Sequence, residues 1–198
     1  MSRRSDATRE KLYAAAVSLI GEQGYHGTTV DDIVDRAGVA KGTVYYHFAG
    51  KEELFQAMLT DGLERLSDAF REQVDAHDDP VDALEGIVVT ELTFIRENQA
   101  FSKLLMSELW RGDRVWREAI VMLRERYVSC VVTVLRRGVE QGVFRPDLDP
   151  QWAASIVFGS IATAALDWLL FDPGRPMADV VSDTARLVMG GVRTTALA

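Results

Sequence analysis

Apolar residues recur every three or four positions along almost the whole chain, the spacing that gives an α-helix one buried face. Strict alternation of apolar and polar residues, which would predict strands, is rare, and Gly and Pro residues separate the helical segments. The pattern therefore predicts an all-α fold of about nine helices. Their expected ranges are roughly 8–22, 29–37, 40–47, 50–76, 81–97, 101–110, 114–141, 150–170 and 177–192.

The segment 29–48 has the pattern of a helix-turn-helix, two short helices joined by a glycine turn. Thr29 and Asp32 have the spacing of a capping box at the start of the first helix. Gly38 stands where the tight turn needs a left-handed backbone. The inner face of the first helix is expected to consist of Val30, Ile33, Val34 and Ala37.

The second helix of this pair is predicted to enter the DNA major groove. On a helical wheel Val44 and Phe48 fall together and face a small core, which leaves tyrosine, threonine and glycine residues pointing outward. Hydroxyl and aromatic groups can contact phosphates and base edges, and the first turn of the helix after Gly50 can bind an anion beside Lys51. The predicted DNA-binding residues are Thr28, Thr29, Lys41, Gly42, Thr43, Tyr45, Tyr46, His47 and Lys51.

The charge distribution supports DNA binding although the formal net charge is −8. Residues 1–51 hold seven Lys/Arg and six Asp/Glu, whereas residues 52–198 hold 15 and 24. From Arg36 to Lys51 there are three basic residues and no acidic one. We therefore expect a basic tip, which phosphate binding requires, on an acidic body. Arg3 and Arg4 are either a basic arm or an ordinary charged tail.

The first 60 or so residues resemble the TetR (tetracycline-repressor-like) family of bacterial regulators. Two positions depart from the family pattern: Ala40 stands where a serine is frequent, and Gly50 where Ser or Asn often caps the next helix. The resemblance implies a DNA-binding domain at 1–52 and a ligand-binding and dimerisation domain at 53–198. The matching residues are Gly24, Tyr25, Thr28, Thr29, Val30, Ile33, Ala37, Gly38, Val39, Lys41, Gly42, Thr43, Tyr45, Phe48, Lys51, Glu52, Leu54 and Phe55.

In the second domain, carboxylates that share an apolar helix face suggest polar contacts to a ligand, because an unpaired buried carboxylate is costly. The alternative for each carboxylate is a salt bridge with a nearby arginine or contact with water at the edge of the core. The aromatic residues nearby could serve only as hydrophobic core. The candidate ligand-binding residues are Glu91, Phe94, Leu105, Glu108, Trp116, Leu123, Tyr127 and Asp167. Arg111, Arg114 and Arg117 loosely resemble a site for acyl-CoA phosphates, or form a solvated basic turn.

The segment 152–171 is apolar nearly all round, so a single core cannot cover its whole surface. It is long enough to span a bilayer, but its Ala, Ser, Thr and Gly content favours a helix–helix interface without a membrane. With the segment 177–192 it is expected to build a homodimer, as the resemblance also implies. The predicted interface residues are Ile156, Gly159, Thr163, Val180, Thr184 and Leu187.

Enzyme signatures are missing from the sequence. His26, His47, His77 and the single cysteine, Cys130, lack metal-ligand spacing, and neither a phosphate loop nor a nucleophile elbow is present, so no metal, cofactor or catalytic residue is predicted. One cysteine and an N-terminus without a signal-peptide pattern favour the cytoplasm. We predict a repressor that binds a palindromic operator as a homodimer and is released by a small, hydrophobic effector. The rival class is a helical lipid-binding protein or hydrolase without a DNA role.

Overall fold

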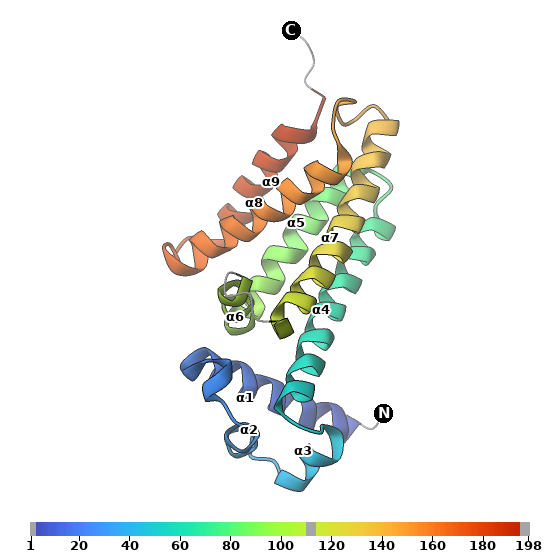
Figure 1. The fold of residues 1–198 in the computed structure, drawn as a ribbon. Coiled ribbons are helices and arrows are strands. Elements are labelled where there is room, and N and C mark those ends of the chain that lie inside the picture. Colours follow the sequence, from blue (N-terminus) through green and yellow to red (C-terminus); the bar gives the residue numbers. More distant parts are fainter. Residues whose placement is uncertain (1–2, 110–113, 195–198) are drawn as a thin grey trace. The chain divides into compact units, whose positions relative to one another are not determined.

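The computed structural model describes residues 3–109 and 114–194, without the side chains of 3–6, 43, 46–47, 106–109, 114–116, 119–120 and 123. The all-α prediction is confirmed, as Figure 1 shows for the described residues. The helices are α1 (Arg3–Gly27), α2 (Val30–Ala37), α3 (Lys41–His47), α4 (Lys51–Ala76), α5 (Pro80–Glu97), α6 (Gln99–Leu109), α7 (Arg114–Glu140), α8 (Pro150–Leu170) and α9 (Met177–Val192).

The first helix extends further than its predicted end at residue 22, and it does so through a kink. Gly24 has φ 78° and ψ 163°, outside the helical region, and one helical turn continues beyond it to Gly27. A positive φ of this kind is accessible to glycine at little cost. The kink therefore explains why the apolar periodicity stops near residue 22 while the chain stays coiled up to the start of the helix-turn-helix.

The chain forms two compact units, 1–63 with 100–120 and 64–99 with 121–198. In the first unit α1 packs on α2 and α2 on α3. Its core includes Leu12, Leu19, Ile33 and Val44, all less than 6% exposed. These units divide the chain differently from the predicted domains 1–52 and 53–198, because α4 runs through both units and α6 belongs to the first.

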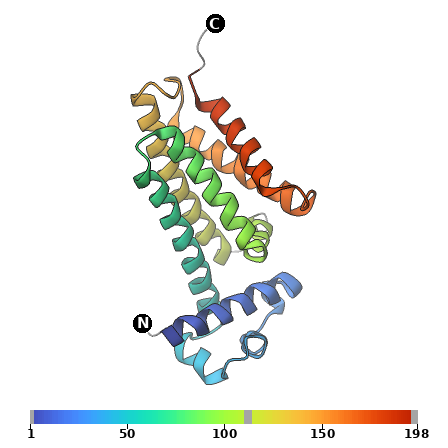
Figure 2. The same ribbon diagram turned by 180° about the vertical axis from the view of Figure 1, so that it is seen from behind.

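In the second unit α5 packs against α8 and α9, which also contact each other (Figures 1 and 2). The segment after α7 is fastened to the end of α9, since the Arg145 amide donates to the Val192 carbonyl (3.0 Å) and the Thr194 amide to the Val143 carbonyl (3.2 Å). Phe144 is fully buried beside Gly138, where a Cβ atom would overlap the Phe144 ring. These contacts hold α9 against the rest of the unit.

By length and composition α8 could cross a membrane, and it is the one described helix that meets both conditions. Its buried positions follow helical spacing: Ala154, Val157, Ile161, Ala165 and Trp168. They provide the face that packs against α5 and α9. Part of its apolar surface is thus used within the second unit, as expected for a helix of a packed bundle.

Candidate nucleic-acid interface and effector site

The predicted capping box at Thr29 is present. The Asp32 amide donates to the Thr29 hydroxyl (3.1 Å), and the Thr29 amide donates to the Asp32 carboxylate (2.9 Å). The hydrogen bonds from Thr29 also lower the pKa of Asp32. Gly38 ends α2 in the left-handed conformation (φ 64°), as the turn requires. The local sequence signals therefore set both ends of α2.

Thr28 and Thr29 are less available to DNA than predicted. The Thr28 side chain is fully buried, and its hydroxyl donates to the Gly24 carbonyl (2.9 Å). The Thr28 hydroxyl therefore closes the kink at the end of α1, and a contact of Thr28 with DNA stays a prediction. The Thr29 hydroxyl is exposed but is already engaged by Asp32. Its contact with a phosphate stays a prediction.

The predicted orientation of α3 is confirmed at its described side chains. Val44 and Phe48 are buried, whereas Gly42 is exposed and Tyr45 is 49% exposed. Val44 therefore faces the core of the first unit, and the opposite face is open to a ligand. The side chains of Thr43, Tyr46 and His47 lie outside the described residues. Their DNA contacts stay predictions.

Gly42→Ala is expected to separate stability from DNA binding. A Cβ atom at Gly42 would meet nothing within 4 Å, so alanine should raise the free energy of unfolding, by up to about 1 kcal/mol. Operator affinity should fall several-fold, because the methyl group would stand between the α3 backbone and the groove. Urea denaturation and fluorescence anisotropy measure the two effects. Gly21→Ala, at an equally open and exposed helical position of α1, should change stability alone.

Lys41 is exposed but not free. Its ammonium contacts the Asp31 carboxylate of α2 at 2.6 Å, and this hydrogen bond raises the pKa of Lys41. Both side chains are more than half exposed, so the pair is a weak one that a phosphate can replace. The segment from Arg36 to Lys51 contains no acidic residue, but in the folded protein Asp31 of α2 lies next to Lys41 and offsets its charge.

Asp31→Asn is expected to tighten DNA binding, because Lys41 would no longer have to leave an acidic partner. Exposed pairs are worth about 0.2–1 kcal/mol, so the gain should be up to about fivefold in affinity. Anisotropy titrations of one labelled operator would measure it. Asp68→Asn, which breaks an exposed pair with Arg71 in α4, is the control and should have no effect. Weaker binding by Asp31→Asn would contradict the proposed role of Lys41.

Lys51 binds the end of α1. Its ammonium donates to the carbonyls of Tyr25 (2.9 Å) and Thr28 (3.0 Å), and its Nζ lies 4.3 Å from the centroid of the Tyr25 ring. Two of its three N–H groups are thus used inside the domain. Lys51 was predicted as a phosphate clamp, and this internal role was missed. Its contact with a phosphate stays a prediction.

Lys51→Met should lower the free energy of unfolding by about 1.5–3 kcal/mol, because hydrogen bonds from a charged donor are lost while the side-chain stem is kept. Affinity should fall for all DNA sequences alike, since the end of α1 also positions the start of α2. Urea denaturation and titrations with two unrelated duplexes would measure both effects. Lys11→Met, on an exposed part of α1, is the control. An unchanged urea midpoint for Lys51→Met would show that the hydrogen bonds from Lys51 to the end of α1 do not stabilise the fold.

Arg36 holds α2 against α1, a function that the sequence did not indicate. Its guanidinium donates to both carboxylate oxygens of Glu22 (2.9 and 3.0 Å) and to the Ser18 hydroxyl (3.1 Å). The hydrogen bonds from Arg36 lower the pKa of Glu22 to about 2. The arginine that precedes the turn is therefore a structural residue whose charge is already paired.

In the second unit the structure brings two predicted ligand residues together, Glu91 of α5 and Tyr127 of α7. Both are buried, with exposed fractions of 6% and 0%. Burial raises the pKa of Glu91 to about 8; the neighbouring Tyr127 hydroxyl opposes this rise. Glu91 Oε2 and Tyr127 Oη have no hydrogen-bond partner among the described residues. The predicted salt-bridge alternative for Glu91 is not found among the described residues.

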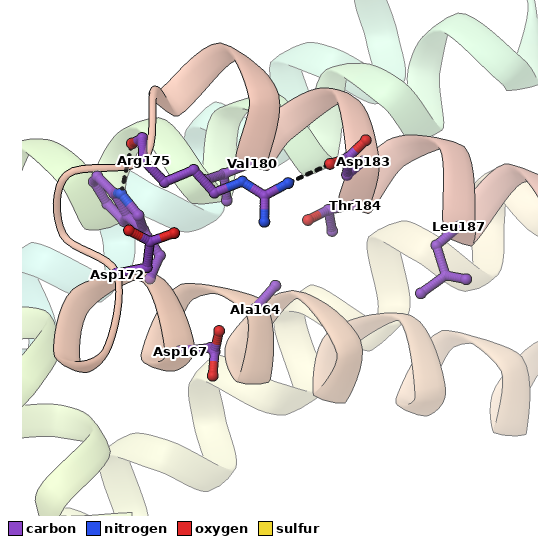
Figure 3. A pocket seen from close by; sticks show the side chains of 9 residues that line it. Ala164, Asp167, Asp172, Arg175, Val180, Asp183, Thr184 and Leu187 are labelled. Atoms are coloured by element: carbon purple, nitrogen blue, oxygen red, sulfur yellow. Dashed lines mark hydrogen bonds and ion pairs between the residues drawn. The ribbon is translucent and has the colours of Figure 1, made fainter.

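The other predicted ligand residues are scattered. Phe94 in the second unit and Leu105 in the first are half-buried. Asp167 is exposed at a pocket of about 220 Å³ between α8 and α9, with Asp172, Arg175 and Asp183 (Figure 3). There the Arg175 guanidinium points toward Asp183, with which it forms an ion pair. The side chains of Glu108, Trp116, Leu123, Arg111 and Arg114 lie outside the described residues, and Arg117 is exposed.

An exposed apolar face runs along α8 and onto α9. Trp152, Ile156 and Leu187 are 68%, 55% and 73% exposed, and Gly159 and Thr163 are exposed beside them. Val180 and Thr184, also predicted for the interface, are buried within the chain, so that prediction needs correction. The buried row of α9 follows steps of four, 180, 184, 188 and 192, and each step turns about 40° past a full turn. Leu187 therefore falls outside the buried row.

A capped helix, a left-handed glycine turn and a second helix with an open polar face define a helix-turn-helix transcription regulator. The family model for bacterial regulatory proteins of the tetR family matches residues 12–58, and that for the tetracyclin repressor-like C-terminal domain matches 77–192. The chain belongs to the TetR family and is a ligand-responsive DNA-binding transcriptional regulator.

Several named relatives span almost the whole chain. The HTH-type transcriptional repressor KstR2 of Mycobacterium tuberculosis is 30% identical over 94% of both chains. The fatty acid metabolism regulator protein of Bacillus subtilis is 25% identical over 92% of this chain and 94% of its own. The structure of the fatty acid degradation regulator FadR from Bacillus halodurans matches with a TM-score of 0.84 and 26% identity, covering 95% and 97% of the two chains. These relatives are named as regulators, not as enzymes.

Proposed function

We propose that the protein represses transcription as a cytoplasmic homodimer whose two α3 helices bind adjacent major grooves of a palindromic operator. Two such helices must lie about 34 Å apart, one turn of DNA, to read both half-sites. The observation that carries the proposal is the outward face of α3, which leaves Gly42 and Tyr45 open while Val44 is buried. The exposed apolar face of α8 and α9 supports dimerisation, because such a surface is costly in water.

The second unit is proposed to bind the effector. The relatives include regulators named for fatty acid metabolism and a ketosteroid transcriptional regulator, KstR2 of Mycobacterium tuberculosis, whose structure matches with a TM-score of 0.76 and 28% identity over 94% and 95% of the two chains. We therefore expect a mainly apolar effector of lipid character. An acyl-CoA is one form of it. A coupling free energy of about 1–3 kcal/mol would lower operator affinity by about 5- to 150-fold.

A selection of random duplex DNA with the purified protein tests the proposal. Repression by a dimer predicts a palindromic consensus, a complex of two chains per duplex, and an affinity that falls steeply with salt because phosphates release counterions. A consensus without symmetry would contradict the dimeric arrangement. Absence of any enrichment, for protein purified both natively and after delipidation, would contradict a DNA-binding role.

A further inference from the structure

Buried side-chain oxygens without partners are found on three helices of the second unit. Among the described residues they are Ser67 Oγ of α4, Glu91 Oε2 of α5 and Tyr127 Oη of α7. Ser67 and Glu91 are 1% and 6% exposed, and Tyr127 is fully buried. Buried polar groups in native proteins nearly always have a hydrogen-bond partner, so unpaired ones need a specific explanation.

Tyr127 is fixed in place by rings on two other helices. Its ring centroid lies 5.0 Å from that of Phe70 on α4, edge to face, and 5.1 Å from that of Phe158 on α8. Burial and the nearby Glu91 raise the pKa of the Tyr127 hydroxyl. The Tyr127 ring is therefore held by contacts with two helices, and neither its hydroxyl nor Glu91 Oε2 has a hydrogen-bond partner among the described residues.

The surroundings of the pair are apolar. On α5 the residues at helical spacing around Glu91 are Ile87, Val88, Leu92 and Ile95, all buried. Burial also raises the pKa of Glu91 to about 8, so at neutral pH the carboxyl group is mostly protonated and can donate a hydrogen bond. None of the described side chains forms an ion pair with Glu91, so among them a buried anion placed here would have no countercharge.

We infer that Glu91 and Tyr127 form a polar subsite that binds a neutral oxygen function, a ketone or a hydroxyl, on an otherwise apolar effector. This inference rests on the proposed effector role of the second unit and specifies the ligand chemistry. The ligand oxygen accepts hydrogen bonds from the Tyr127 hydroxyl and the Glu91 carboxyl group, and its hydrocarbon part contacts the apolar residues around them. A hydroxyl group can in addition donate to the free carboxyl oxygen. A carboxylate should bind more weakly, because it would be desolvated and none of the described side chains pairs Glu91 with a cation.

Competition binding with matched twelve-carbon compounds tests the subsite. The probes are 2-dodecanone, 1-dodecanol and dodecanoate, each displacing the neutral dye N-phenyl-1-naphthylamine from the full-length protein at pH 7. We expect the ketone and the alcohol to bind at least about 10-fold more tightly than dodecanoate, since desolvating a carboxylate that has no cationic partner costs more than desolvating a neutral oxygen. Equal or tighter binding of dodecanoate, or failure of ketone and alcohol to displace the dye, would overturn the subsite.

Two substitutions assign the preference to these side chains. Tyr127→Phe keeps the ring contacts with Phe70 and Phe158 but removes the hydroxyl, and should reduce the preference for the ketone several-fold. Glu91→Gln keeps a neutral donor and acceptor and should retain it. Tyr13→Phe on α1 is the matched control and should behave as wild type. Circular dichroism and dye binding show whether each variant is folded, and an undiminished preference in folded Tyr127→Phe would refute the assignment.

Operator binding by the same samples distinguishes the two proposals. If the ketone binds in a Tyr127-dependent way but the protein stays bound to the selected operator, the subsite is supported. Its role as an effector site is then contradicted. Absence of any operator would contradict the proposed function alone, because the dye competition does not require DNA.

Discussion

The double variant Ile156→Arg, Leu187→Arg should be monomeric and bind a full operator at least about 100-fold more weakly than the wild type. The reason is that the DNA-binding domain of the second chain would no longer be tethered to that of the first. Ile156 and Leu187 are 55% and 73% exposed and line one groove between α8 and α9. A guanidinium in each would have to be desolvated on association. Being exposed in the single chain, both positions should accept arginine without loss of the fold.

Light scattering would give the mass, and anisotropy would compare a full operator with an isolated half-site. The wild type should strongly favour the full operator, and the variant should bind the two duplexes almost equally. Val89→Arg is the control, because Val89 is 43% exposed on α5, away from this face. A variant that stays dimeric would place the interface elsewhere. A wild type that binds full and half-sites equally would contradict dimeric recognition.

Glu91→Gln should stabilise the protein at neutral and alkaline pH and remove part of its pH dependence. The Glu91 carboxyl has a pKa of about 8 in the folded protein against its ordinary value of 4.5, so the folded state binds its proton more tightly than the unfolded state. Stability from this group is therefore complete below pH 4.5, falls as pH rises through the interval to about 8, and is lost above it. At pH 7 the loss amounts to about 3 kcal/mol.

Urea denaturation from pH 5 to 9 would measure this effect as the difference between wild type and variant, which cancels the contributions of other titrating groups. The difference should grow with pH up to about 8 and then level off. Glu85→Gln, at an exposed position of the same helix, is the control and should give a small, flat difference. A flat difference for Glu91→Gln would mean that the carboxyl group is solvated in the folded protein.

The sequence predicted those features whose causes lie within a few residues. Thr29 and Asp32 start α2, Gly38 ends it, and the wheel of α3 separates Val44 from Tyr45, because caps and periodicity are local. The placement of Glu91 on a buried face followed from the same reasoning, since α5 has one clearly apolar side.

Features that depend on contacts across the fold were missed or wrong. Lys51 binds carbonyl groups 23 and 26 residues away, and Lys41 meets Asp31 from another helix, so neither partner could be read from spacing. Asp167 is exposed, which the sequence could not predict. Because α8 is apolar on most sides, a helical wheel does not show which of its residues face the core. The burial of Val180 and Thr184 depends on how α9 crosses its neighbours, which is a property of packing.

The continuity of α4 constrains how this chain can change during evolution. The helix begins at Lys51, which holds the end of α1, and carries Ser67 among the buried oxygens of the second unit. One inserted or deleted residue between them would rotate every later side chain by about 100° and shift it by about 1.5 Å. Length changes should therefore accumulate outside this interval, for example in the connection at 77–79, whereas the interval from Lys51 to Ser67 keeps its length even where its surface residues vary.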